Sequence, residues 1–196
     1  MTRERPNFET ADAARLIHPD APPGKAAKYA LAERERRFLL RAVPNGIPAA
    51  RVLIEDRYLV GTRLRLRQMT DLDGPENSAI YKLTQKIPTA AGTPGLITTI
   101  YLSATEYAAL IEVPARTLRK IRSSFPPLGV DVFEGPLRGL ILAEAEFDGG
   151  ASEAAFQSPS DVVAEVTADV RFTGGALVKL GRDGTTALLA EFGIAS

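Results

Sequence analysis

The sequence predicts an α+β fold in which eight antiparallel strands close into a β-barrel with a few flanking helices. From Ala30 onward, short segments typical of strands alternate with turn signals such as Pro44-Asn45-Gly46 and Gly135-Pro136. Charged residues recur at every second position in several of these segments, so they share one face of each strand. A barrel with a charged interior accounts for both patterns, because eight strands can enclose a small ligand and closure removes exposed sheet edges.

The predicted elements follow one another with few long gaps. The eight strands are expected over residues 31–43, 50–60, 62–70, 78–87, 95–103, 116–125, 128–134 and 139–147. Helices are expected over 104–111, near 151–157 and near 159–165. Ser103 or Thr105 would cap the first helix, since a short polar side chain can accept a backbone N–H there.

The chain divides into a short arm and one domain. Residues 1–28 hold several prolines and little periodicity, which predicts a partly ordered arm, and residues 29–196 form the single predicted domain. The chain is 45% hydrophobic and 24% charged, an ordinary globular composition. It has no apolar run long enough to span a membrane and no secretory signal at its start, so a cytoplasmic location is expected.

The composition excludes several kinds of chemistry. Cysteine is absent and His18 is the only histidine, which leaves no disulfides, thiolate metal sites, histidine clusters or Ser-His-Asp triads. The net charge is zero, which gives no reason to expect nucleic-acid binding. Charge is uneven, however, at +5 over residues 1–90 and −5 over residues 91–196. A basic wall and an acidic wall can therefore meet within one fold.

The charged positions in the strands are informative because five strands repeat the pattern and the signs are segregated. Each of these sets shares a strand face: Glu33, Glu35 and Arg37; Arg63, Arg65 and Arg67; Lys82, Thr84 and Lys86; Lys120 and Arg122; Glu144 and Glu146. A sheet with one solvated face would explain any single strand. Arginine forks match phosphate oxygens, and carboxylates suit hard cations such as Mg²⁺ or Mn²⁺. The combination indicates a metal–polyphosphate ligand.

The order of the motifs resembles the CYTH superfamily, the triphosphate tunnel metalloenzymes, across residues 30–180. The matching segments are Glu33-Arg34-Glu35-Arg36-Arg37, Asp56-Arg57-Tyr58-Leu59, Arg63-Leu64-Arg65, Leu83-Thr84-Gln85-Lys86, Lys120-Ile121-Arg122, Val130-Asp131-Val132-Phe133-Glu134-Gly135, Glu144-Ala145-Glu146 and Glu165-Val166-Thr167. Each segment is weak alone. The ordered set is what makes the resemblance specific.

The resemblance implies a closed tunnel of eight strands with phosphates and a metal held inside. The implied phosphate contacts are Arg37, Arg63, Arg65, Lys82, Lys86, Lys120 and Arg122. The implied metal-side carboxylates are Glu33, Glu35, Glu144, Glu146 and Glu165, and Asp131 and Arg171 are further candidates. Glu33, Glu35 and Arg37 are the implied catalytic residues, with Mg²⁺ or Mn²⁺ as the cofactor.

The predicted function is metal-dependent hydrolysis of an inorganic or organic triphosphate inside the barrel. The protein would be a monomer or a homodimer that binds this small molecule, no nucleic acid and no membrane. Two alternatives stay open. A class IV-type adenylyl cyclase would use a nucleotide 3′-hydroxyl as the attacking group. A non-catalytic triphosphate- or polyphosphate-binding protein would keep the basic wall alone.

Three positions depart from the family pattern. Arg37 replaces the signature lysine, so a planar fork stands in place of a point charge. Thr99 and Tyr101 stand where two carboxylates are expected, which predicts that one metal position is weak or absent. Glycine, at Gly174-Gly175, stands where an asparagine is expected.

Overall fold

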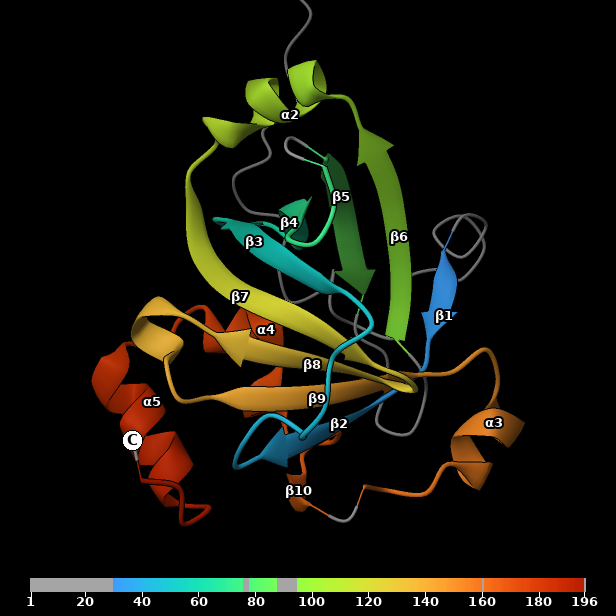
Figure 1. Ribbon diagram of the computed structural model, residues 1–196. Coiled ribbons are helices and arrows are strands. Elements are labelled where there is room, and N and C mark those ends of the chain that lie inside the picture. Colours follow the sequence, from blue (N-terminus) through green and yellow to red (C-terminus); the bar gives the residue numbers. More distant parts are fainter. Residues whose placement is uncertain (1–29, 76–77, 88–94, 160, 196) are drawn as a thin grey trace, which may run out of the picture.

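The computed structural model describes residues 30–75, 78–87, 95–159 and 161–195 as a mostly-β fold with few helices (Figure 1). The strands are β1 (Leu31–Glu33), β2 (Glu35–Leu40), β3 (Arg51–Leu59), β4 (Leu64–Asp71), β5 (Ala79–Ile87), β6 (Gly95–Leu102), β7 (Ala115–Phe125), β8 (Leu128–Phe133), β9 (Ile141–Glu146) and β10 (Val162–Glu165). They form one antiparallel sheet in the order β1-β6-β5-β4-β3-β7-β8-β9-β2-β10. The predicted arm, residues 1–28, lies outside the described residues, as does His18.

The described residues form ten strands where eight were predicted, and the two differences have separate causes. The first predicted strand is divided at Arg34 into β1 and β2. The predicted helix over 159–165 is wrong, because Val162–Glu165 forms β10 and pairs with β2. Two adjacent β-branched residues, Val162 and Val163, favour a strand, and the free edge of β2 supplies the hydrogen-bond partners. The other seven predicted strands are found close to their expected positions.

The continuous segment that contains β1 and β2 pairs with two strands, β6 and β9, that are far apart in the strand order. In β1, Ala32 lies opposite Leu96 of β6, and in β2, Arg37 lies opposite Glu144 of β9. The change of partner falls at Arg34, whose carbonyl accepts a hydrogen bond from the Phe147 amide at 3.0 Å. Figure 1 shows β7 curving from the upper strands toward β8 and β9, so the sheet is strongly bent. One extended segment thereby contacts both β6 and β9.

The helices cover the sheet at three places. They are α2 (Ala104–Ile111), α3 (Gly150–Ala155), α4 (Gly174–Leu177) and α5 (Arg182–Ala190). The predicted helix over 104–111 is confirmed, and Ser103 is its cap: its hydroxyl accepts the Glu106 amide at 3.2 Å while the Glu106 carboxylate accepts the Ser103 amide at 2.7 Å. Of the described residues, none belongs to a helix long and apolar enough to cross a membrane.

The largest hydrophobic core joins the sheet to the C-terminal segment. Strand residues pack there against Phe172, Leu177 and Leu189, which belong to the segment that includes α4 and α5. The strand residues are Leu39, Leu118, Phe133 and Leu142. A separate cluster around Leu66 and Tyr107 packs α2 against the sheet. The C-terminal segment is thus an integral part of the fold.

Leu39 tests how much the C-terminal core stabilises the sheet. Its side chain is fully buried, so Leu39→Ala should lower the free energy of unfolding by about 2–5 kcal/mol through lost burial and the cavity left behind. Leu31→Ala is the matched control, because Leu31 lies in the same extended segment and is 74% exposed. Denaturant unfolding of both variants is the measurement. Equal losses would contradict the assignment of Leu39 to the core.

Candidate functional site: a buried cluster of arginines and carboxylates

The strand register places most of the predicted charged residues on one face of the sheet. Directly opposed residues of antiparallel strands share a face. Arg67 on β4 lies opposite both Asp56 on β3 and Lys82 on β5. Arg122 on β7 lies opposite Asp131 on β8, and β2 and β9 continue the same face. We call this face, which carries Arg67, Asp131 and Glu144, the inner face.

Asp56 organises one half of the charged residues. Arg67 donates two hydrogen bonds to the Asp56 carboxylate, from Nε at 2.6 Å and from Nη2 at 2.7 Å. The Arg65 Nε lies 3.5 Å from Oδ1 of the same carboxylate. Burial raises the pKa of Asp56, but the Arg67 hydrogen bonds and the charges of Arg67, Arg65 and Lys120 outweigh burial and leave that pKa below its ordinary value. Asp56 is therefore a buried anion held by cations.

Asp131 and Glu144 organise the other half. Arg122 donates from Nε to Asp131 at 2.7 Å and from Nη2 to both Asp131 and Glu144, while Lys120 donates to Asp131 at 2.5 Å. Arg37 lies 3.5 Å from Glu144 and also donates to Glu35. Each buried charge thus has a partner of opposite sign, as charges out of water require.

The inner cluster, as we call these residues together, carries an excess of positive charge. It consists of Arg37, Arg65, Arg67, Lys120 and Arg122 with Glu35, Asp56, Asp131 and Glu144. Five cations against four carboxylates give it a formal excess of one positive charge, and the mostly exposed Glu146 carboxylate lies 3.9 Å from Arg122 at its edge. Burial lowers the pKa of Lys120, and the charges of Arg122 and Arg67 act in the same direction against Asp131 and Glu144. The cluster therefore favours an added anion.

One cation of the inner cluster has an unfilled donor. The Arg65 Nε is buried, and among the described residues it has no hydrogen-bond acceptor. A buried donor left without an acceptor costs roughly 1–3 kcal/mol, so a ligand oxygen at this point would be favoured. Arg65 is consequently the least satisfied arginine of the inner cluster.

The apolar core seals one side of the inner cluster. Leu39, Leu118, Phe133 and Leu142 each stand two residues along a strand from a charged member: Arg37, Lys120, Asp131 and Glu144. In addition, Arg37 Nη1 donates to the Phe172 carbonyl at 3.2 Å. The C-terminal segment therefore excludes water from this end of the charges and fixes the position of Arg37.

Four predicted residues lie on the inner face at the edge of the inner cluster: Glu33, Lys82, Lys86 and Glu146. Lys86 donates to Glu33 at 2.6 Å in a partly exposed pair. The Lys82 ammonium lies 4.9 Å from the centre of the Tyr101 ring. The Glu146 side chain is 75% exposed and lies 3.9 Å from Arg122. Half-buried Arg63 precedes β4 and completes the set of predicted phosphate contacts.

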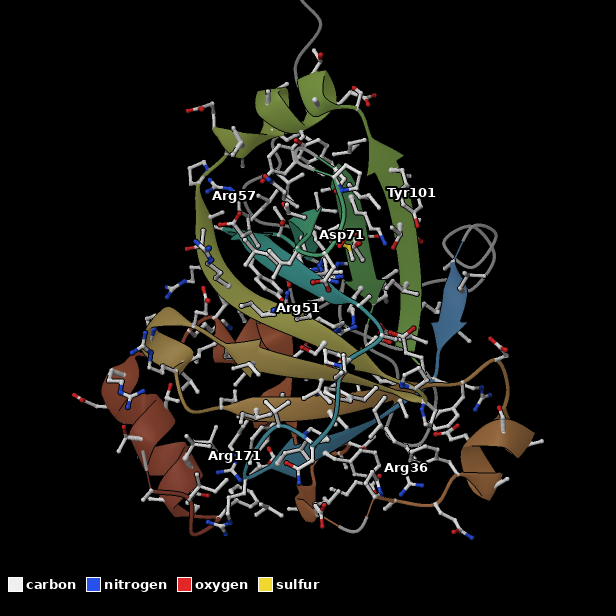
Figure 2. All side chains as sticks on the ribbon, in the orientation of Figure 1. Arg36, Arg51, Arg57, Asp71, Tyr101 and Arg171 are labelled. Carbon is white, nitrogen blue, oxygen red and sulfur yellow. The ribbon has the colours of Figure 1, made fainter. Side chains whose placement is uncertain are left out.

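Two predicted residues are not brought to the inner cluster. Glu165 lies opposite Phe38, on the other face, where Arg36 donates to it at 2.9 and 2.6 Å. Arg171 pairs with Asp169 and Glu191, each at 2.7 Å. Figure 2 shows Arg36 on the side of α3 and Arg171 on the side of α5. The Arg36–Glu165 pair joins the chain that follows β9 to β2, whereas the Arg171 pairs lie within that chain.

Thr99 and Tyr101 lie on the inner face, as predicted. Thr99 lies opposite Thr84, with 3.2 Å between their hydroxyl oxygens, and Tyr101 lies opposite Lys82. Tyr101 is 70% exposed. Neutral hydroxyls therefore occupy the inner face of β6, where the sequence resemblance leads one to expect carboxylates.

The arrangement of the carboxylates does not fit a divalent cation. Arg37 donates a hydrogen bond to the Glu35 carboxylate, and Arg122 donates one to the Glu144 carboxylate. Within the described ranges, no group of three or more Asp, Glu, His or Cys side chains could hold a metal ion. Carboxylate oxygens are the right donors for Mg²⁺ or Mn²⁺, but here arginines use them.

Sequence reasoning missed Asp56 and Arg67 as site residues. Arg67 is the third member of the alternating series with Arg63 and Arg65, and that period could have identified it. Asp56 lies in the middle of β3 with Ile54 and Tyr58 on the same face, whereas the adjacent Glu55 points to the other face. An acidic residue at a buried strand position signals a cationic partner, but its identity depends on the register between β3 and β4.

The paired carboxylates predict acid sensitivity. Burial raises the pKa of Glu144, but Lys120, Arg122 and Arg37 outweigh burial and hold that pKa well below its ordinary range. The stabilisation is therefore fully present above about pH 4.3, the ordinary glutamate value, and is lost as pH falls toward the folded-state pKa. The thermal unfolding midpoint of the native chain should fall below that pH.

Glu144→Gln should show a smaller fall between pH 5 and pH 3, since it lacks this titrating group, and a lower midpoint at pH 7. Glu134→Gln, on the more exposed Arg119 pair, is the matched control and should keep the native pH dependence. A native-like acid fall in Glu144→Gln would contradict the role assigned to this carboxylate.

Comparison with protein-family models finds no match, and comparison with curated proteins finds none either. Among solved structures, the inorganic triphosphatase NE1496 is 26% identical, with 76% of this chain and 95% of that chain covered and a TM-score of 0.49. A conserved hypothetical protein from Pyrococcus furiosus is 15% identical, with 84% and 93% covered and a TM-score of 0.43. A proposed adenylate cyclase from Vibrio parahaemolyticus is 10% identical, with 84% and 90% covered and a TM-score of 0.37.

All three TM-scores lie below 0.5, so the activities of these proteins do not transfer to the chain. The chain has a structural likeness to these proteins, and the resemblance to the CYTH superfamily rests on its ordered sequence motifs.

Proposed function

We propose that the chain binds the phosphate groups of a small-molecule triphosphate on the inner face and hydrolyses the terminal phosphate bond. The observation that carries this proposal is the convergence of five cations on four carboxylates, with a buried and unfilled donor at Arg65 Nε. A triphosphate offers many oxygens along one chain. It can therefore contact several guanidinium groups at once, which a single phosphate cannot.

Binding would proceed by competition with the internal carboxylates. Phosphate oxygens compete with Glu35 and Glu144 for Arg37 and Arg122, and the positive excess of the inner cluster favours the incoming anion. Arg65 makes only a long ion pair with Asp56, so it loses little interaction energy when it donates to a ligand oxygen instead. Arg65 is thus the natural first contact.

Closure of the sheet is part of the same proposal. The segment that contains β1 and β2 contacts both β6 and β9, and its alternate residues Glu33, Glu35 and Arg37 continue on one face across the break. We infer that this segment closes the bent sheet into a tunnel around the inner cluster. A closed wall would lower the local dielectric and strengthen every contact between arginine and phosphate.

In hydrolysis, water would attack the terminal phosphorus in line and the bond to the bridging oxygen would break. Inorganic triphosphate would yield phosphate and pyrophosphate. Guanidinium groups of the inner cluster would stabilise the charge on the transferring phosphoryl group and the leaving oxygen, the main task of the protein in this reaction class. Mg²⁺ or Mn²⁺ stays the cofactor that the sequence predicts, and the carboxylates as arranged do not fit it.

A second function, binding without hydrolysis, is favoured by one specific observation. Glu35 and Glu144 are engaged by arginines, while Thr99 and Tyr101 replace two expected carboxylates on the inner face. A protein in this state could hold a triphosphate and leave its bonds intact. An assay of phosphate release separates the two functions, and an assay for a cyclic nucleotide product tests the cyclase alternative.

Arg65→Ala tests the binding site. At a concentration of inorganic triphosphate one hundred times the dissociation constant, the ligand should stabilise the native chain by about 2.7 kcal/mol, and Arg65→Ala should remove most of this shift. Arg119→Ala is the matched control, because Arg119 is about half exposed and pairs with Glu134 away from the inner cluster. Thermal unfolding with and without ligand is the measurement. An undiminished shift in Arg65→Ala would refute the proposed site.

The second test concerns Thr99 and Tyr101. Thr99→Glu combined with Tyr101→Glu adds two carboxylates to the inner face and should raise the affinity for Mn²⁺ and the rate of phosphate release. Ile100→Glu is the control, since Ile100 is 51% exposed and lies on the opposite face of β6. Calorimetry with Mn²⁺ and a phosphate-release assay are the measurements. Fast native hydrolysis at low metal, lost in the double variant, would show that Thr99 and Tyr101 are themselves adapted to the reaction.

A further inference from the structure

Tyr58 stands beside the inner cluster without belonging to any of its ion pairs. It lies directly opposite Arg65 in the ladder between β3 and β4, on the inner face. Its ring packs against the core that contains Phe172 and Leu177, so it joins the C-terminal segment to the charged residues.

The Tyr58 hydroxyl lies against the backbone of Gly174. A β-carbon at position 174 would lie 2.0 Å from the hydroxyl oxygen and 3.1 Å from the carbon that bears it. Real β-carbons essentially never come within 3.0 Å of a heavy atom outside their own and the adjacent residues. A side chain at position 174 would therefore force the Tyr58 hydroxyl to shift. The neighbouring Gly175 has nothing within 4 Å of the same position, so this effect is confined to Gly174.

Arg65 has two neighbours on the inner face. Tyr58 lies directly opposite it in the ladder, and the Arg65 Nε lies 3.5 Å from Asp56. That Nε has no hydrogen-bond partner among the described residues although it is buried. A long side chain loses much rotational freedom when it is fixed in one place, so a fixed arginine binds an anion more tightly than a free one.

We propose that Tyr58 is a positioning residue that fixes the Arg65 guanidinium for a phosphate group, and that Gly174 is glycine because it leaves room for the Tyr58 hydroxyl. This inference rests on the proposed binding of a triphosphate. It links the departure at Gly174-Gly175 from the family pattern to a contact at the site. Tyr58 acts through Arg65 and takes no part in bond breaking.

The test is a cycle of variants measured by calorimetry with inorganic triphosphate at low ionic strength, where the four other cations keep binding measurable. Tyr58→Phe removes the hydroxyl alone and should weaken binding about tenfold, the effect of one hydrogen bond to a charged group. In the Arg65→Ala background, Tyr58→Phe should weaken binding less than twofold. A purely structural role would give the same factor in both backgrounds and would overturn the inference.

The outcomes separate this inference from the proposed function. If the native chain does not bind triphosphate, the proposed function fails and the inference fails with it. If the native chain binds and Arg65→Ala weakens binding while Tyr58→Phe does not, only the inference fails.

Gly174 is tested by stability as well as by affinity. Gly174→Ala should lower both the unfolding midpoint and the affinity, and Tyr58→Phe in the same chain should restore much of the midpoint, because it removes the oxygen at 2.0 Å. Gly175→Ala should change neither property. A native-like midpoint and affinity in Gly174→Ala would overturn the proposed role of Gly174.

Discussion

The pairing of opposite charges that lie out of water is the interaction on which the rest of this structure depends. Asp131 is fully buried and Lys120 is 6% exposed, so each would be strongly unfavourable without its partner. The pairs connect β2, β7, β8 and β9, and a second set connects β3 to β4. Because the strand register decides which charges meet, a shift by one residue would leave buried charges alone. The inner cluster thus stabilises one register of the sheet.

The same ion pairs also affect ligand binding, because a ligand must compete with the carboxylates for the arginines. The carboxylates neutralise most of the basic wall, so the inner cluster can exist in the absence of an anion, and the remaining positive charge still attracts one. A ligand must replace carboxylates at several arginines at once, which favours a chain of phosphates over a single one. Arg65 is the exception, since it approaches Asp56 only at 3.5 Å. We propose that the C-terminal segment supports it through Tyr58, whose hydroxyl lies against Gly174.

Most strands could be predicted because alternating charges and regular turn signals are local features of the sequence. The shared strand face of Arg65 and Arg67 also followed from their period of two. What the sequence could not predict depends on partners far away in the chain. Val162–Glu165 forms a strand because it can pair with the edge of β2. Glu165 lies opposite Phe38 as a result. The hydrogen bonds from Arg67 to Asp56 and the contact of Tyr58 with Gly174 likewise depend on how distant parts of the chain pack together.

The central claim is that the inner cluster binds the phosphates of a triphosphate. A crystal structure of the chain grown with inorganic triphosphate tests this claim most directly. The account predicts phosphate oxygens on the inner face between β4 and β7, with one oxygen accepting a hydrogen bond from Arg65 Nε, and Glu35 or Glu144 withdrawn from its arginine. A triphosphate bound elsewhere on the surface, with every ion pair of the inner cluster unchanged, would contradict it.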